Sequence, residues 1–256
     1  MIHSNTLLQS FTAWLKSDII KVLYKNLDKK ERNGMEYVKK FFILVGLFLV
    51  SQISMTVFVV AKQFSLEMGE TNLSLFASIL LILVVIGNIW LLMFLGKKLG
   101  FLNLSWDFFT KKNVGIILGG FVLARVIAIG GTLLLNTQGS ESTANDAAIQ
   151  TMFLGENPLL ILLLIGFSAP IMEEIVFRGG IIGFWLEKFP MVGIAISSIS
   201  FGLIHGPTNL ISFLIYGLMG LILSMAYYKT QRLEISISIH FLNNILAAIV
   251  IAFGLI

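Results

Sequence analysis

Long apolar runs dominate this sequence and restrict what it can fold into. They lie at residues 41–61, 73–95, 114–135, 158–186, 191–205, 209–228 and 236–256. A helix needs roughly 20 apolar residues to cross a hydrocarbon core about 30 Å thick, and most of these runs have that length. The fourth run is long and contains Pro170 and Gly179-Gly180, which predicts a broken or tilted helix, whereas the fifth run is short.

The composition excludes a soluble globule. Of the 256 residues 57% are hydrophobic and only 12% are charged, and the mean hydropathy is +0.91. Such a chain has too few polar side chains to cover a water-exposed surface. The sequence therefore predicts an all-α, polytopic transmembrane helical bundle of about seven spans, in a cell membrane and more specifically a bacterial plasma membrane.

Basic residues in the connections predict the orientation of the bundle. Eight of the eighteen lysines and arginines lie within residues 1–40, whereas the connection at 136–157 contains acidic residues and no lysine or arginine. Because basic loops stay in the cytoplasm, we expect the N-terminus inside and that connection outside. We divide the chain into a basic cytoplasmic segment (1–40), amino-terminal spans (41–153) and a carboxy-terminal transmembrane domain (154–256).

The basic amino-terminal segment allows two interpretations. The stretch TLLQSFTAWLKSDIIKVLY is either an amphipathic helix on the inner leaflet or an ordinary solvated tail. The chain has no cysteine, so it has neither disulfides nor a thiol nucleophile. The inner loops account for the positive charge, so we predict membrane lipids as partners and no nucleic acid.

Three ionisable residues interrupt the fourth run, in the stretch SAPIMEEIVFRGG. Glu174 and Arg178 are four residues apart, so they lie on one face of a helix and can neutralise each other. Glu173 points about 100° away and is the carboxylate left over. An unpaired carboxylate in a poorly hydrated site suits the role of a general base.

Histidines in two later runs are the natural partners of such a base. His205 ends the stretch FGLIH, and His240 and Asn244 share one helical face in HFLNN. Ionisable residues within a membrane usually face a cavity or one another, so we expect these groups to converge. Glu173 and His205 could then deprotonate a water molecule, while His240 and Asn244 stabilise an oxyanion. A zinc ion held by Glu173, His205 and His240 is the alternative, although HExxH is absent.

The three stretches resemble the ordered motifs EExxxR, FxxxH and HxxxN of the CPBP family of intramembrane proteases. That family groups type II CAAX prenyl endopeptidases with Abi-domain proteins linked to bacteriocin processing and self-immunity, and the resemblance covers residues 154–256. It implies peptide-bond hydrolysis in the membrane. In this chain the implied catalytic residues are Glu173, His205, His240 and Asn244.

The same resemblance assigns supporting roles to Glu174, Arg178 and Phe201. The family has been classed as metalloproteases, whereas our preferred mechanism requires no cofactor and keeps zinc as the alternative. The implied substrate is a membrane-associated or lipidated protein or peptide, in bacteriocin processing, self-immunity or CAAX-type processing.

Each candidate residue also has a structural interpretation. Glu174 and Arg178 are expected to form a structural ion pair, His205 can cap its helix, and Asn244 can join two helices. Phe201 is expected to pack around the site, and Arg125 either counters the carboxylates or extends toward the membrane surface. Two other functions fit the same residues: a non-catalytic immunity or scaffold protein of this fold, and a proton-coupled transporter.

Overall fold

The structure, a computed structural model, describes residues 34–255. The predicted amphipathic helix at residues 6–24 and most of the basic segment 1–40 lie outside the described residues. By its internal contacts the chain divides into two units, Met1–Ile43 and Leu44–Ile256. The description below concerns the second unit, which contains all the candidate residues.

Every regular element of the described residues is helical, which confirms the predicted all-α class. The fourth apolar run contains two π-helical segments, Leu162–Ser168 and Ile175–Trp185, and a short 3-10 turn occupies Trp106–Phe108. The α-helices are α2 (Ile53–Glu67), α3 (Leu75–Lys98), α4 (Lys111–Asn136), α5 (Ala144–Phe153), α6 (Pro158–Ile161), α7 (Ala169–Glu174), α8 (Pro190–Ile204), α9 (Leu210–Thr230) and α10 (Leu233–Ala252).

Six helical stretches of the described residues are long and apolar enough to cross a membrane, and a seventh apolar helix is shorter, which agrees with about seven spans. The seventh is α8, whose 15 residues make it only about 22 Å long. The six stretches are Gly34–Glu67, Leu75–Lys98, Lys111–Asn136, Pro158–Trp185, Leu210–Thr230 and Leu233–Ala252.

Polar side chains fix where several helices begin. Ser74, Thr110 and Asn209 each accept a hydrogen bond from a backbone N–H of the first turn of α3, α4 and α9. These caps satisfy donors that a helix cannot pair internally. Thr143 does the same for α5, a helix within the predicted outer connection that the apolar pattern did not indicate.

Of the two predictions for the fourth run, a broken or a tilted helix, the break is wrong and the tilt stays a prediction. The helix runs without interruption from Pro158 to Trp185. Proline lacks an N–H, and its ring collides with the carbonyl four residues earlier in a regular α-helix. Here α7 lies between the two π-helical segments, and their wider turns let the chain pass Pro170 while it stays helical.

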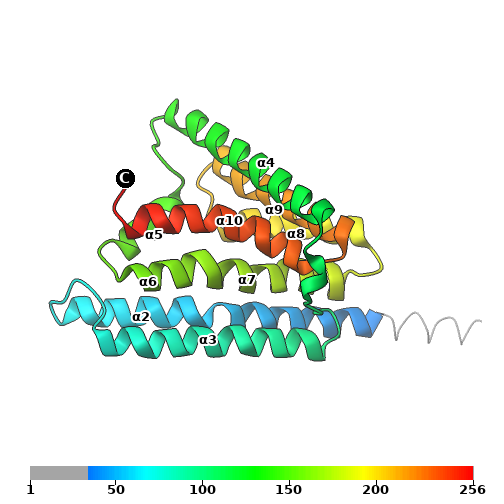
Figure 1. Cartoon of the computed structure of the whole chain (residues 1–256), viewed down its shortest axis with the longest axis horizontal. Coiled ribbons are helices and arrows are strands. Elements are labelled where there is room, and N and C mark those ends of the chain that lie inside the picture. Colours follow the sequence, from blue (N-terminus) through cyan, green and yellow to red (C-terminus); the bar gives the residue numbers. More distant parts are fainter. Residues whose placement is uncertain (1–33, 256) are drawn as a thin grey trace, which may run out of the picture. The chain divides into compact units, whose positions relative to one another are not determined.

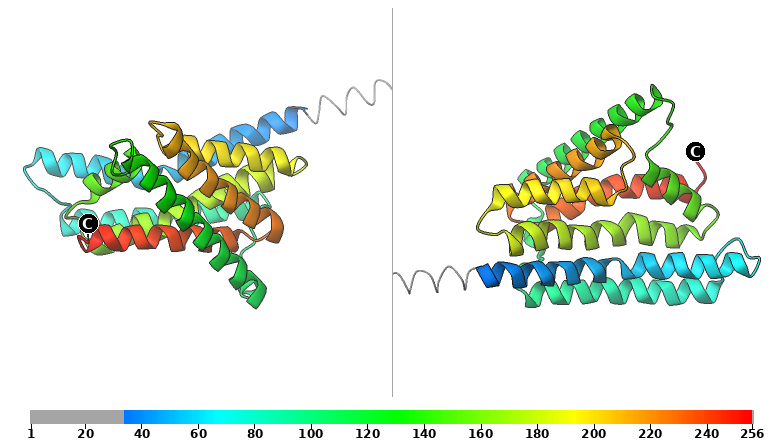
Figure 2. Two further views of the ribbon diagram at one scale, coloured as in Figure 1. Left: turned by 90° about the horizontal axis from the view of Figure 1, so that it is seen from above. Right: turned by 180° about the vertical axis from the view of Figure 1, so that it is seen from behind.

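The helices of the second unit pack around the fourth apolar run. Figures 1 and 2 show α2 beside α3, α10 beside the α6–α7 stretch, and α4 running obliquely across α9. Helices α8 and α9 pack closely because Gly220 has no side chain. A Cβ at that position would lie 3.2 Å from the Ser198 Cα of α8.

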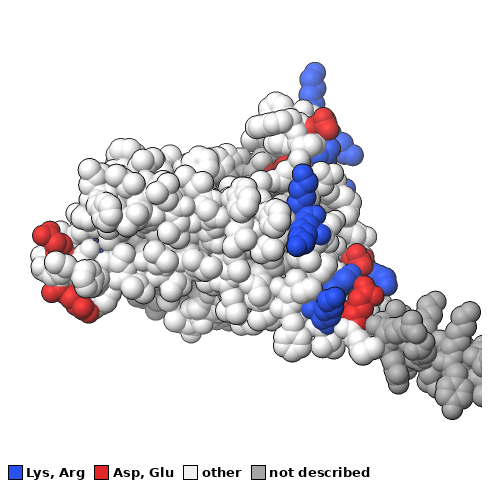
Figure 3. Space-filling model, turned by 90° about the horizontal axis from the view of Figure 1, so that it is seen from below, with Lys and Arg blue, Asp and Glu red and all other residues white. Residues whose placement is uncertain are grey.

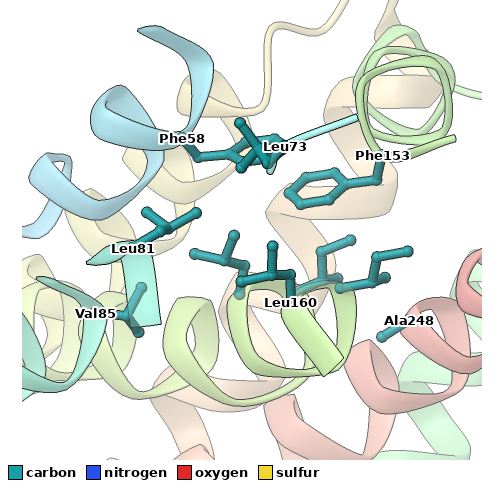
Figure 4. Packing of buried hydrophobic residues seen from close by; sticks show 10 residues of the cluster. Phe58, Leu73, Leu81, Val85, Phe153, Leu160 and Ala248 are labelled. Carbon is teal, nitrogen blue, oxygen red and sulfur yellow. The ribbon is translucent and has the colours of Figure 1, made fainter. Parts of the chain in front are cut away.

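An apolar core joins helices that are distant in the sequence. Figure 4 shows Phe58 of α2 and Phe153 of α5 together with side chains of α3, α6 and α10, and the two rings stack with centroids 4.3 Å apart. A buried ion pair between Lys62 and Glu156 lies nearby, and the Leu73 backbone N–H also donates to Glu156. The core and this ion pair attach α5 and the start of α6 to α2 and α3.

Charged side chains are concentrated toward the helix ends. In Figure 3 acidic side chains lie at both ends of the visible face, and the lysines and arginines are seen mainly at one of them. Lys97 and Lys98 end α3, and Lys111 and Lys112 begin α4. Charges at the helix ends suit a membrane-spanning bundle, while the side on which the N-terminus lies stays a prediction.

Candidate active site

Glu174 and Arg178 form the predicted ion pair at the centre of the unit. Arg178 Nη1 donates to Glu174 Oε1 over 2.7 Å, and both side chains are completely buried. Arg178 Nη2 also donates to the Gly220 carbonyl of α9 at 3.0 Å, and its guanidinium lies 4.5 Å from the Phe201 ring centroid. This arginine therefore connects the fourth helix to both α9 and α8.

His240 of α10 lies between the two glutamates, a contact that the sequence did not indicate. Its Nδ1 is 2.9 Å from Glu174 Oε1, and its Nε2 is 3.9 Å from Glu173 Oε2. Because Glu174 also accepts from Arg178, it is a carboxylate, so His240 Nδ1 carries a proton and donates it. The other ring nitrogen of His240 faces Glu173.

Glu173 is the glutamate without a close ionic partner, as the sequence predicted. Its side chain is 21% exposed, and its Oε2 is buried with no hydrogen-bond partner in the described structure. The carboxylate borders a cavity. It is therefore placed to bind a small polar molecule such as water.

His205 follows the last residue of α8, and its ring contacts a backbone carbonyl and two aromatic rings. Its Nδ1 is 2.7 Å from the Phe201 carbonyl, which can only accept, so Nδ1 carries the proton and Nε2 keeps a lone pair. Phe201 packs on one side with ring centroids 4.6 Å apart, and Tyr216 of α9 stacks with centroids 4.2 Å apart and planes 13° apart. Phe201 also contacts His240 edge-to-face, with centroids 5.6 Å apart.

Asn244 lies one turn beyond His240 on α10. Its side-chain amide donates to the Ile165 carbonyl at 3.3 Å, in the first π-helical segment. This contact is the helix-joining role that we considered for Asn244. The amide has a second N–H, and the residue borders the same cavity as Glu173.

One cavity of about 750 Å³ brings together the four residues that the motifs single out as catalytic. Most of its remaining wall is apolar, and α5 contributes to it with Ile149 and Met152. A largely apolar cavity with a few converging polar groups is typical of a ligand or substrate site. The residues that the motifs select and that border it are Glu173, Phe201, His205, His240 and Asn244.

The alternative zinc ligands do not form a metal site. Among residues 34–255 no group of three or more histidine, aspartate or glutamate side chains is arranged to hold a metal ion. Glu173, His205 and His240 share the cavity without forming such a group. We therefore derive no step through a metal.

Within the described part of the chain Arg125 does not contact the site, whereas Tyr216 contacts His205. Arg125 is half-buried on α4, and no ion pair or side-chain hydrogen bond joins it to another described residue, so it shows no contact with the carboxylates. Tyr216 was missed, because an aromatic residue in an apolar helix gives no functional signal. Its hydroxyl contacts Asp146, Thr143 and Asn145 at the start of α5.

These features define a multi-pass membrane protein whose helical bundle contains a cavity with converging glutamate, histidine and asparagine side chains. Residues 155–246 match the family model described as type II CAAX prenyl endopeptidase Rce1-like. All three motifs lie in this segment, so the predicted resemblance to that family is confirmed.

Curated relatives support the same relationship. The UPF0177 protein YvdC of Lactococcus lactis subsp. lactis (strain IL1403) is 27% identical over 148 residues, which cover 58% of this chain and 56% of the relative. The UPF0177 protein in the abiGi 5′ region of Lactococcus lactis subsp. cremoris is 29% identical over 66% of this chain and 73% of its own length. The "Putative membrane peptidase YdiL" of Bacillus subtilis (strain 168) is 36% identical over 33% of this chain and 34% of its own length. The chain thus spans little more than half the length of YvdC, and no solved structure matches it.

Proposed function

We propose that this chain is an intramembrane endopeptidase that hydrolyses peptide bonds with an activated water molecule and without a catalytic metal. The observation that carries the proposal is the cavity in which Glu173, without a close ionic partner, meets His205, His240 and Asn244. The match to a family of endopeptidases and the likeness to a protein named as a membrane peptidase support it.

In the proposed mechanism Glu173 and His205 activate water. The lone pair of His205 Nε2 is available because Nδ1 donates to the Phe201 carbonyl. Glu173 borders the cavity with a side chain that is 21% exposed, and it has no close ionic partner. Either group can accept a proton from a water molecule in the cavity as its oxygen attacks the peptide carbonyl.

The resulting tetrahedral intermediate carries a negative oxygen that needs hydrogen-bond donors. Asn244 supplies the amide N–H that the Ile165 carbonyl does not use. His240 already donates from Nδ1 to Glu174, so it donates from Nε2 only as an imidazolium. The intermediate then collapses: the C–N bond breaks, and the proton taken from water passes to the leaving amine.

The proposed substrate is a membrane-associated or lipidated protein or peptide, because the cavity wall is mostly apolar. The relatives come from Lactococcus and Bacillus, which supports a bacterial plasma membrane as the location. Processing of a bacteriocin, self-immunity and CAAX-type cleavage are the candidate roles. The second candidate function is a non-catalytic immunity or scaffold protein, which the helix-joining contact of Asn244 with Ile165 favours.

Cleavage of a quenched fluorescent peptide library by the purified protein in lipid vesicles tests the proposal. Wild type should cleave, and Glu173→Gln should lower the rate by about 10²- to 10⁴-fold, the usual contribution of a general base. Glu70→Gln, on the exposed loop after α2, is the matched control and should keep the wild-type rate.

The same assay separates the alternatives. Cleavage that survives a chelator supports the metal-free mechanism, whereas loss that zinc restores would show a metalloprotease. Equal rates for wild type and Glu173→Gln would refute the role of Glu173. Two results together would favour the scaffold: folded protein cleaves no peptide, and cells that carry Glu173→Gln keep the same immunity to a bacteriocin as cells with the wild type.

A further inference from the structure

Tyr216 makes contacts that the family motifs do not explain. It lies on α9, its ring is buried, and it stacks almost parallel to the His205 ring. His205 therefore contacts two aromatic rings, the stacked ring of Tyr216 and the tilted ring of Phe201. Only Phe201 belongs to a motif.

The hydroxyl of Tyr216 is held by three side chains from a single turn. It donates to Asp146 Oδ1 at 2.9 Å and accepts from Thr143 Oγ1 at 2.8 Å and Asn145 Nδ2 at 3.2 Å. One donor and two acceptor positions are all that a phenol offers, so the group is saturated. The ring therefore has little freedom to move away from His205.

The turn that holds Tyr216 is itself well fixed. Thr143 is the N-cap of α5, and its Oγ1 accepts from the Asp146 backbone N–H at 3.1 Å. Thr143 is buried, with 2% of its surface exposed. The far end of α5 is fixed by Phe153, which stacks on Phe58 of α2.

We propose that Tyr216 is a positioning residue, which holds the His205 ring so that its Nε2 faces the cavity, and that the Thr143–Asp146 turn of α5 fixes Tyr216 in turn. This inference rests on the proposed function. The stacked ring blocks rotation of His205 out of the plane set by its hydrogen bond to the Phe201 carbonyl. Helix α5 also borders the cavity, so His205 has the proposed orientation only when α5 is correctly packed.

Two substitutions at Tyr216 separate its ring from its hydroxyl. Tyr216→Leu removes the stacking and should lower kcat about 10- to 100-fold, since a misplacement of about 1 Å can lower a rate about 10²-fold. Tyr216→Phe keeps the ring and should lower kcat less. KM should change less than kcat in both variants, because Tyr216 is one of many residues that line the cavity. Tyr228→Leu, a half-buried tyrosine farther along α9, is the control and should leave kcat unchanged.

Histidine spectra test the positioning without any activity. The chain has three histidines, so ¹⁵N-labelled histidine gives three sets of ring signals, and His205→Gln identifies the one of interest. Wild type should show His205 as the Nδ1–H tautomer with ring protons shifted by the aromatic neighbours. Tyr216→Leu should remove much of that shift and mix the tautomers.

The outcomes distinguish this inference from the proposed function. Unchanged His205 signals in both Tyr216 variants would overturn the positioning role, whatever the activity. The positioning role would also be overturned if kcat fell only in proportion to the amount of folded protein and was as low in Tyr216→Phe as in Tyr216→Leu. If Tyr216→Leu does not fold, Tyr216→Phe and Asp146→Ala decide, and both should broaden or shift the His205 signals. An inactive wild type with the expected spectra would refute the protease and leave the positioning intact.

Discussion

Removal of the Arg178 charge should destabilise the protein strongly, and Arg178→Met is the most direct test of the central cluster. The substitution leaves Glu174 buried without its cation, and it removes the donor to the Gly220 carbonyl. Loss of one partner from a buried ion pair typically lowers the free energy of unfolding by about 3–5 kcal/mol. His240 still donates to Glu174, so we expect a value near the lower end.

Equilibrium unfolding in mixed micelles with increasing sodium dodecyl sulfate measures this loss. The control is Lys98→Met. Lys98 is exposed at the end of α3, so removal of its charge should change the free energy of unfolding by no more than about 1 kcal/mol. A double variant, Arg178→Met with Glu174→Gln, should be less destabilised than the sum of the two single variants. A loss below about 1 kcal/mol for Arg178→Met would refute the reasoning, because it would mean that the buried carboxylate needs no partner.

Three further substitutions test other parts of the structure. Lys62→Met leaves the buried Glu156 without its cation and should lower the free energy of unfolding by about 3 kcal/mol in the same assay. A change of less than about 0.5 kcal/mol would contradict a buried ion pair there. Gly220→Leu places a side chain against the backbone of α8 and should cost about 1–3 kcal/mol, whereas Gly119→Leu faces open space and should change stability by less than about 0.5 kcal/mol. Asn244→Ala should slow peptide cleavage about 10²-fold or more and lower the free energy of unfolding by less than about 1.5 kcal/mol. A rate that falls only in proportion to the amount of folded protein would support a purely structural role of Asn244.

The sequence predicts most of the helices because membrane spans have a simple requirement of length and apolar composition. The run predicted at 158–186 is helical from Pro158 to Trp185, and the run predicted at 191–205 is helix Pro190–Ile204. The sequence does not predict that two segments of this helix are π-helical. Pro170 indicates an irregularity, but whether a helix breaks or widens depends on the neighbours that hold it in place.

The candidate site was predictable where a contact is local in sequence. The pair of Glu174 and Arg178 follows from their spacing of four residues on one helix. The contact of His240 with Glu174 joins residues 66 positions apart and depends on how α10 packs on α7. Tyr216 depends in addition on α5, a helix that the apolar pattern did not indicate, so nothing in the sequence connected it with His205. The catalytic roles themselves stay a prediction.

Charge balance explains how this bundle tolerates so many ionisable groups. Glu173, Glu174, Arg178 and His240 form one cluster, in which the charge of Arg178 offsets that of Glu174. This pairing avoids much of the cost of an isolated charge in a poorly hydrated interior. Within the cluster Glu174 is 2.7 Å from Arg178 and 2.9 Å from His240, whereas Glu173 is 3.9 Å from His240. Glu174 is therefore committed to holding the cluster together, and Glu173, weakly paired and open to the cavity, is the carboxylate that remains available for a proton from water.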